Sequence, residues 1–122
     1  MSNNLVYHLR CKLCKQPYVG KTVQIIANRL SGHRNKFFEY IRLNGKIKGD
    51  STDNEYVPGM HLYNCHGLKN FEDFNNNFTL TILEKCSPSN LDIKEHLWIQ
   101  KLGTLNPLGL NLVDPFGFPL LI

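Results

Sequence analysis

Long hydrophobic runs are missing from this sequence. No apolar stretch approaches the roughly 20 residues that a membrane-spanning helix needs. The first residues, Met1 to Asn4, are polar where a secretory signal would be basic and then apolar. No internal repeat or low-complexity tract appears, which argues against a solenoid and a disordered linker. We therefore expect a soluble, intracellular protein that spans residues 1–122 as a single domain.

Acidic residues are scarce in the first 50 positions. Only Glu39 and Asp50 stand there against ten Lys and Arg, so this part carries 10 − 2 = +8. The rest of the chain has four Lys and eight acids, 4 − 8 = −4, which gives the net charge of +4. A one-sided basic half is typical of a surface that binds polyanions. Lysines scattered over a solvated helix face would give the same count.

Cysteine is sparse, with Cys11, Cys14, Cys65 and Cys86 only. Without a secretory signal, metal ligation explains these thiols better than a disulfide framework does. Hydrophobic residues make up 42% of the 122 residues, which is enough for one modest core. A chain this short gains stability from a metal site or a partner.

The cysteine spacing predicts a structural zinc site. Cys11 and Cys14 form a C-x2-C pair, and two thiolates on a tight turn can reach one zinc ion at ~2.3 Å. His61 and His66 supply the other half, and Cys65, next to His66, could replace it. Four protein ligands leave no open position for substrate, so the role of Zn²⁺ would be structural. The alternative is that these are small buried residues and ordinary histidines.

Hydrophobic periodicity predicts a small α+β domain in the order β-β-α-(α)-β-α, with a three-stranded antiparallel sheet flanked by helices. Thr22 is expected to cap the first helix, which Gly45 and Gly49 end, and Asn90 to cap the last helix. Strands are expected at 5–10, 18–20 and 78–83, and helices after Thr22, at 57–64 and at 91–102. Polar or irregular segments are expected at 50–55 and 69–77, and an apolar tail at 112–122.

An ordered set of residues resembles the GIY-YIG nuclease family. Val6-Tyr7 and Tyr18-Val19-Gly20 look like its two tyrosine motifs, although Leu5 stands where the family has glycine. Arg29 follows nine residues after Gly20, and His33 lies one helical turn further on. Glu95 resembles the family's metal-binding glutamate, and Asn111 its C-terminal asparagine. The resemblance spans about residues 5–111 and implies a DNA endonuclease.

The cysteine pair between the two tyrosine motifs narrows the resemblance. It is similar to the nuclease domain of Penelope-like retroelements, which carries a zinc-binding insertion there, here around residues 11–14 and 61–66. The end of the chain is also similar, with Trp98-Ile99, a leucine-rich turn and Gly109-Leu110-Asn111. This resemblance implies a retrotransposon polyprotein that includes a reverse transcriptase. It also implies nuclear DNA as the substrate, nicked or cut during element insertion.

The resemblance assigns a role to each residue. Tyr7 would be the general base and Tyr18 its hydrogen-bonding partner, or the two could be reversed. Arg29 would bind the scissile phosphate, and His33 would orient the phosphate or a tyrosine. Glu95 would hold the catalytic Mg²⁺ or Mn²⁺, and Asn111 would fix the architecture of the site. Further contacts to DNA would come from Lys21, Arg34 and Lys36.

A tyrosine base needs help from its surroundings. A free phenol has a pKa near ~10, so we expect nearby cations to lower the pKa. Arg29, Lys21 and the metal ion are the candidates.

Two other functions remain open. The chain could be a non-catalytic, zinc-stabilised module that binds nucleic acid through its basic half. It could also be a GIY-YIG nuclease of a repair or restriction type. Taken singly, each site residue has an ordinary structural explanation, such as a strand aromatic or a surface charge. The nuclease hypothesis therefore depends on the order and spacing of the whole set. The sequence does not indicate an oligomeric state.

Overall fold

A three-stranded antiparallel sheet forms the centre of the fold, with strand order β2-β1-β3. The computed structural model describes residues 4–46, 55–112 and 115–116. The strands are β1 (Leu5–Cys11), β2 (Pro17–Thr22) and β3 (Phe78–Lys85). The helices are α1 (Ile26–Arg42), α2 (Val57–His66), α3 (Asp73–Asn77), the 3₁₀ turn η1 (Pro88–Asn90) and α4 (Leu91–Leu102). The predicted α+β class and three-stranded sheet are confirmed.

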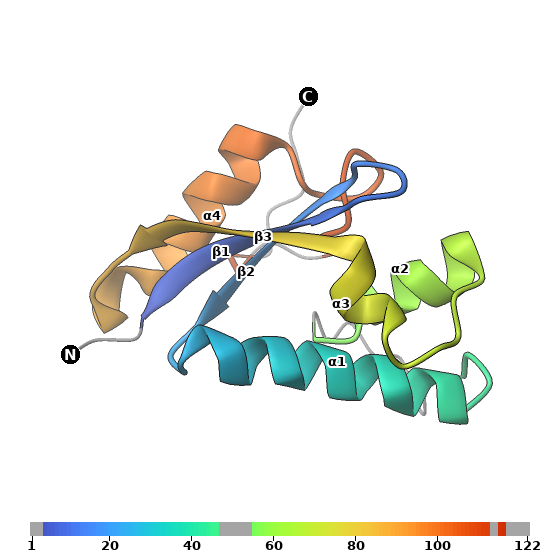
Figure 1. The fold of residues 1–122 in the computed structure, drawn as a ribbon. Helices are drawn as coiled ribbons and strands as arrows, with labels where there is room; N and C mark the ends of the chain where they lie inside the picture. Colours follow the sequence, from blue (N-terminus) through green and yellow to red (C-terminus); the bar gives the residue numbers. More distant parts are fainter. Residues whose placement is uncertain (1–3, 47–54, 113–114, 117–122) are drawn as a thin grey trace.

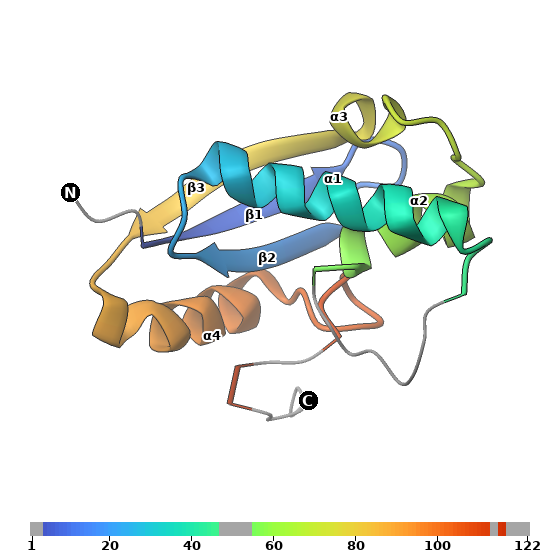
Figure 2. The ribbon, with the colours of Figure 1, turned by 90° about the horizontal axis from the view of Figure 1, so that it is seen from below.

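Helices cover both faces of the sheet. In Figure 1, α1 lies below the strands, with α2 and α3 on the same side, and α4 lies above them. Figure 2, seen from below, shows α1 in front of the sheet and α4 running beside β2, which is an edge strand. This layering places the N-terminal end of α1 and the α4 helix on opposite sides of the same sheet edge.

The alternation of side chains along β1 creates two cores. Leu5, Tyr7 and Leu9 are buried toward α1, together with Phe37 of that helix. Val6 points to the other face and packs in a second buried cluster with residues of α4. The strands β1 and β2 are thus buried largely on both faces, whereas β3 stays partly exposed, and the apolar residues of the short chain are shared between two small cores.

Of the two helix caps expected from the sequence, Thr22 is wrong, whereas Asn90 does occupy the N-cap position of α4 but without a capping hydrogen bond. Thr22 is the last residue of β2, where it pairs with Leu5, so its backbone is committed to the sheet. Its hydroxyl accepts a hydrogen bond from the backbone N–H of Gln24 at 2.9 Å, and α1 begins only at Ile26. Asn90 precedes α4 but makes no side-chain cap hydrogen bond, because η1 leads into the helix directly. The segment 69–77, expected to be irregular, contains the short helix α3.

Some expectations concern residues outside the described ranges. These are the helix end at Gly49, most of the loop 50–55 and most of the apolar tail 112–122. Within the described part, α1 ends at Arg42, and Asn44 and Gly45 follow with positive φ. No helix there is long and apolar enough to cross a membrane.

The segment after α4 protects the free edge of β2. The Asn111 side chain accepts a hydrogen bond from the Val19 N–H and donates one to the Val19 carbonyl, both at 2.8 Å. The neighbouring N–H of Leu110 donates to the Pro17 carbonyl at 2.8 Å. Asn111 is fully buried, so these bonds satisfy edge groups that water does not reach. Its predicted architectural role fits this geometry.

Asn111→Ala should destabilise the fold. It leaves the buried N–H and C=O of Val19 without their partner, and each such group costs ~1–3 kcal/mol. We expect the free energy of unfolding to fall by about 2–4 kcal/mol, measured by urea denaturation. The control Asn28→Ala, at an exposed position of α1, should change it by less than about 0.5 kcal/mol. Equal effects would contradict this account of the β2 edge.

Candidate functional site

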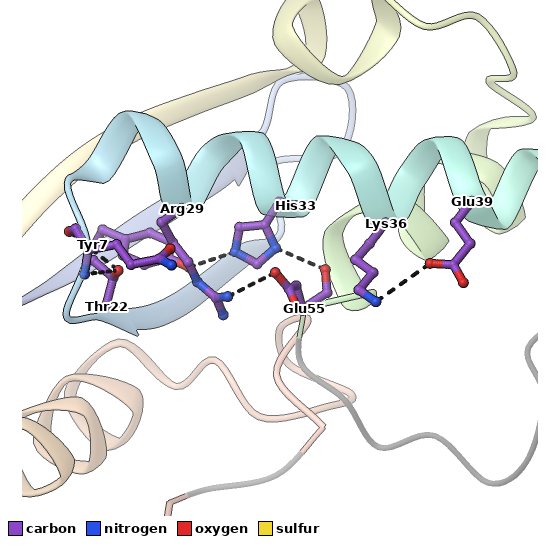
Figure 3. Close-up of polar contacts among 8 residues, drawn as sticks. Tyr7, Thr22, Arg29, His33, Lys36, Glu39 and Glu55 are labelled. Carbon is purple, nitrogen blue, oxygen red and sulfur yellow. Dashed lines mark hydrogen bonds and ion pairs between the residues drawn. The ribbon is translucent and has the colours of Figure 1, made fainter.

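The Tyr7 hydroxyl is the centre of a buried polar cluster. The Arg29 Nε–H donates a hydrogen bond to this oxygen at 3.1 Å, and the His33 Nε2 atom lies 2.6 Å from it. Arg29 and His33 stand one turn apart on α1, whereas Tyr7 comes from β1 (Figure 3). Tyr7 and His33 are both fully buried. The structure thus brings these three sequence-predicted residues into direct contact.

The protonation pattern of His33 follows from its second contact. The His33 Nδ1 atom lies 2.9 Å from the backbone carbonyl oxygen of Glu55, which can only accept a hydrogen bond. Nδ1 therefore carries the proton, and Nε2 presents a lone pair to the Tyr7 hydroxyl. The Tyr7 O–H donates to His33 while its oxygen accepts from Arg29. The three hydrogen bonds therefore all run in the same direction: Arg29 donates to Tyr7, Tyr7 to His33, and His33 to the Glu55 carbonyl.

Local backbone features aim the Tyr7 side chain. The register between β1 and β3 shifts between Val6 and Tyr7, and such irregularities bend a strand and redirect a side chain. On the other side Tyr7 pairs with Gly20, where a Cβ atom would overlap the Tyr7 ring. The glycine of the second tyrosine motif thus has a steric role, because it leaves room for the Tyr7 ring on the opposite strand.

Tyr18 packs beside this cluster. Its ring centroid lies 6.4 Å from that of Tyr7 and 5.5 Å from that of His33. Burial raises the pKa of Tyr7 to about 12, against the lowering effect of Arg29, and raises the pKa of Tyr18 well above its usual value. Arg29 lowers the phenol pKa as expected, but desolvation outweighs the guanidinium, so the net shift of both residues is upward rather than downward.

Acidic residues accompany the cations of the site. The Arg29 Nη1 atom lies 3.2 Å from the Glu55 carboxylate. The Lys21 ammonium lies 3.5 Å from Glu95 Oε1 and also contacts Asp92. Glu95 is only 6% exposed, and its charge acts on both tyrosines by raising their pKa. The pair with Lys21 connects α4 with β2 and brings the predicted metal ligand to the tyrosine cluster.

A pocket of about 430 Å³ opens where the end of β2 meets α1 and α4. Its lining combines two cations and a carboxylate with small polar and apolar groups: Lys21, Thr22, Val23, Gln24, Arg29, Glu55 and Leu91. The α1 helix begins just after Gln24 and has no acidic residue in its first turn. The positive end of the helix macrodipole therefore adds to the attraction for an anion at this end of the pocket.

Glu95 is the residue that the sequence predicted as the ligand of a hard divalent cation. Mg²⁺ keeps several waters and is commonly bound through one or two carboxylates. Glu95 supplies one largely buried carboxylate beside the pocket cations. Lys21 lies 3.5 Å from this carboxylate and also pairs with Asp92.

A second cluster joins the β1–β2 hairpin to α2. The ligand atoms of Cys11, Cys14, His61 and His66 all lie within 4.8 Å of one another. The Cys14 Sγ–His61 Nε2 and His61 Nε2–His66 Nε2 distances are 3.2 Å, and the Cys11 Sγ–His66 Nε2 distance is 3.6 Å. Tetrahedral zinc with ordinary bond lengths would separate its ligand atoms by ~3.3–3.8 Å. The four residues therefore could hold a structural metal such as zinc.

The ligand set answers the question that the sequence left open. His66 belongs to the cluster, whereas Cys65 is exposed on α2 and does not. Burial lowers the pKa of His61, which keeps its imidazole neutral for ligation.

Three predicted residues lie away from the tyrosine cluster. Asn111 binds the backbone of Val19, as described above. Arg34 donates to the Ser31 hydroxyl at 3.2 Å on its own helix. The Lys36 ammonium lies 3.5 Å from Glu39 and 4.7 Å from the centroid of the Tyr56 ring. Arg34 and Lys36 thus form part of the α1 surface rather than of the pocket.

Sequence reasoning missed Glu55 and Asp92 as members of the site. Glu55 was part of a polar loop, and Asp92 was one helix residue among others. A usable signal exists only for Asp92, which stands three residues before Glu95 and so shares its helix face. Nothing local marks Glu55, because its contacts with Arg29 and His33 arise only in the folded chain.

The metal cluster predicts one tightly bound zinc ion per chain. Cys14→Ser should lose the ion and lower the melting temperature, since a structural metal contributes its binding free energy to folding. Cys65→Ala is the matched control, because this thiol lies next to a ligand but outside the cluster. Zinc content by atomic absorption and melting curves check this. Retention of zinc by Cys14→Ser, or its loss from Cys65→Ala, would contradict the assignment.

The raised pKa of Tyr7 predicts a loss of stability in alkali. The phenol ionises near 10 in the unfolded chain and at about 12 in the folded one, so between these values the unfolded state binds fewer protons. Stability is complete below pH 10 and falls above it, by about 2–3 kcal/mol for a shift of this size. Urea denaturation should show a shallower fall for Tyr7→Phe. A wild-type slope in Tyr7→Phe would refute the assignment.

Comparison of the chain with protein-family models, with curated proteins and with solved structures found no match.

Proposed function

We propose that this chain is a metal-dependent DNA endonuclease of the GIY-YIG type that hydrolyses phosphodiester bonds. The observation that carries the proposal is the double contact of the Tyr7 oxygen, which accepts from Arg29 Nε at 3.1 Å and donates to His33 Nε2 at 2.6 Å. A phenol held between a guanidinium and a proton acceptor suits the activation of water next to a phosphate. This contact joins residues 26 positions apart in the sequence.

The proton path follows from the hydrogen bonds. With its pKa raised to about 12, Tyr7 does not stand as a phenolate at neutral pH. Its oxygen, which is buried in the free chain, instead takes the proton of a water that must reach it together with the substrate, while its own proton passes to His33 Nε2. Glu55 holds the opposite ring nitrogen through its carbonyl, so the imidazolium that forms stays hydrogen-bonded. Tyr7 is thus the general base and His33 the group that stores its proton.

Phosphate binding falls to the cations of the pocket. Arg29 presents a planar fork that suits two phosphate oxygens and offsets the charge that develops during hydrolysis. Lys21, at the end of β2, adds a second positive charge in the same pocket. When bound at Glu95, Mg²⁺ or Mn²⁺ would act as a Lewis acid on the phosphate and the leaving 3′ oxygen.

The zinc cluster has a structural role in this proposal. It ties the hairpin tip at 11–14 to α2, which follows Glu55 directly. By the resemblance to Penelope-like elements, the chain cuts or nicks nuclear DNA for element insertion and shares a polyprotein with a reverse transcriptase. Arg34 and Lys36 extend the basic surface along α1 toward flanking DNA.

Cutting of a supercoiled plasmid tests the function. We expect nicking or linearisation with Mg²⁺ or Mn²⁺, and none with EDTA. Arg29→Lys and Glu95→Gln should lower the rate at least about 100-fold, the scale of losing one preorganised electrostatic contact. Tyr7→Phe should do the same, because it removes the proton acceptor. Glu72→Gln, an exposed carboxylate outside the site, should cut like the wild type.

Circular dichroism and zinc content confirm that each variant is folded. A wild-type chain that binds DNA in a salt-sensitive manner but never cuts it would refute the nuclease proposal. That outcome would favour a nucleic-acid-binding module instead. Cutting that survives Glu95→Gln would refute the assignment of the metal ligand.

A further inference from the structure

Glu55 contacts both residues that hold the Tyr7 hydroxyl. Its backbone carbonyl accepts from His33 Nδ1 at 2.9 Å, and its carboxylate lies 3.2 Å from Arg29 Nη1 (Figure 3). The two contacts are chemically separable, because a side-chain substitution leaves the carbonyl in place. The carboxylate therefore has an effect of its own on Arg29.

The Glu55 carboxylate lies in the pocket itself. Arg29 and Glu55 both line it, and their side chains keep 21% and 27% of their surface exposed. The Arg29 Nε–H is bound to Tyr7, and Nη1 faces the carboxylate, so an internal anion already occupies part of the guanidinium fork. An anionic ligand from solution would meet Arg29 at the same side of the pocket.

A glycine on α1 makes room for this carboxylate. A Cβ atom on Gly32 would lie 2.5 Å from Glu55 Oε1, which is closer than two such atoms can approach. Gly32 stands inside α1, where glycine is unfavourable relative to alanine. The helix thus carries its glycine at the position where the Glu55 carboxylate rests against it.

We propose that the Glu55 carboxylate is an internal competitor for the anion site at Arg29, which an incoming phosphate must displace. The identification of that anion as a DNA phosphate rests on the proposed function, whereas the competition itself does not. A phosphate can bind the fork through two oxygens and so replaces the carboxylate contact with a stronger one. A monoanion that makes a single contact gains less binding free energy at Arg29 than such a phosphate does. The site thereby favours a phosphate that is held by several contacts at once.

Binding of inorganic phosphate to the full, zinc-loaded chain tests this. The Nε–H resonance of Arg29 in nuclear magnetic resonance reports the dissociation constant at that residue. Glu55→Gln, which keeps the backbone carbonyl and the side-chain shape, should bind phosphate about tenfold more tightly than the wild type. Gly32→Ala should give a similar gain, because it moves the carboxylate away from Arg29 without removing its charge.

Glu39→Gln is the matched control. It removes one negative charge from the Lys36–Glu39 ion pair on α1, the helix that carries Arg29, so it measures the general electrostatic effect. We expect the dissociation constant for phosphate to change by less than about twofold. In the background Arg29→Gln, Glu55→Gln should give no gain, read from the backbone resonances of Lys21 and Gln24.

The outcomes separate three explanations. Tighter binding in both Glu55→Gln and Gly32→Ala, but not in Glu39→Gln, supports the competitor. Weaker binding in Glu55→Gln means that the carboxylate orients Arg29 for its ligand, which overturns the proposal. Equal gains in Glu55→Gln and Glu39→Gln reduce the effect to net charge and overturn it as well.

The same variants distinguish this proposal from the nuclease function. If the wild type never cuts plasmid DNA but phosphate binding follows the expected order, the competitor stands and the nuclease proposal falls. If the wild type cuts DNA but Glu55→Gln binds phosphate no better than the wild type, the nuclease proposal stands and the competitor proposal falls. With both intact, Glu55→Gln should lower KM for DNA more than it changes kcat.

Discussion

The buried hydroxyl of Tyr7 is the contact on which the site depends. A phenol oxygen removed from water needs hydrogen-bonding partners, and α1 supplies both from residues one helical turn apart. This requirement fixes how α1 lies across the sheet, because Arg29 and His33 must reach the same oxygen. Gly20 and the register shift beside Tyr7 serve the same end, since they give the ring its place and direction. Glu55 then holds the outer side of both α1 residues.

Two further groups of contacts support this arrangement in a small domain. Asn111 closes the outer edge of β2 at Val19, next to Tyr18, so the strand that carries the second tyrosine is satisfied on both sides. The Cys11, Cys14, His61 and His66 cluster brings the hairpin tip against α2, where a structural metal such as zinc could bind all four side chains. Both groups of contacts act on backbone segments that flank the tyrosine cluster. A modest hydrophobic core therefore does not have to position the polar groups by packing alone.

The elements were readable from the sequence where the signal is local. Alternation along 5–10 and 78–83 and the period of the last helix gave elements that the structure confirms within one to two residues. The four residues of the possible metal site were also named from the sequence, and for the cysteines the signal was local, since C-x2-C is a tight turn. The cap at Thr22 failed because sheet pairing took precedence over intrinsic preference, and Asn90 occupies the predicted N-cap position without making the capping hydrogen bond. Glu55 could not be found, because its partners lie 22 and 26 residues away and the fold alone unites them.

The count of charges along the sequence is the least reliable guide to the surface of the folded protein. The first 50 residues carry +8 and look like a free polyanion surface. In the structure Lys21, Arg29 and Lys36 each contact a carboxylate, and for Lys21 and Arg29 it comes from the acidic part of the chain. At the pocket, basic residues from the first 50 positions therefore form ion pairs with acidic residues from the rest of the chain. An anion that enters the pocket therefore exchanges ion pairs rather than meeting bare cations, so its affinity should rise less than the count of basic residues implies. The cost of parting these pairs falls on every anion, and an anion that makes further contacts in the pocket offsets it better than one that binds through its charge alone.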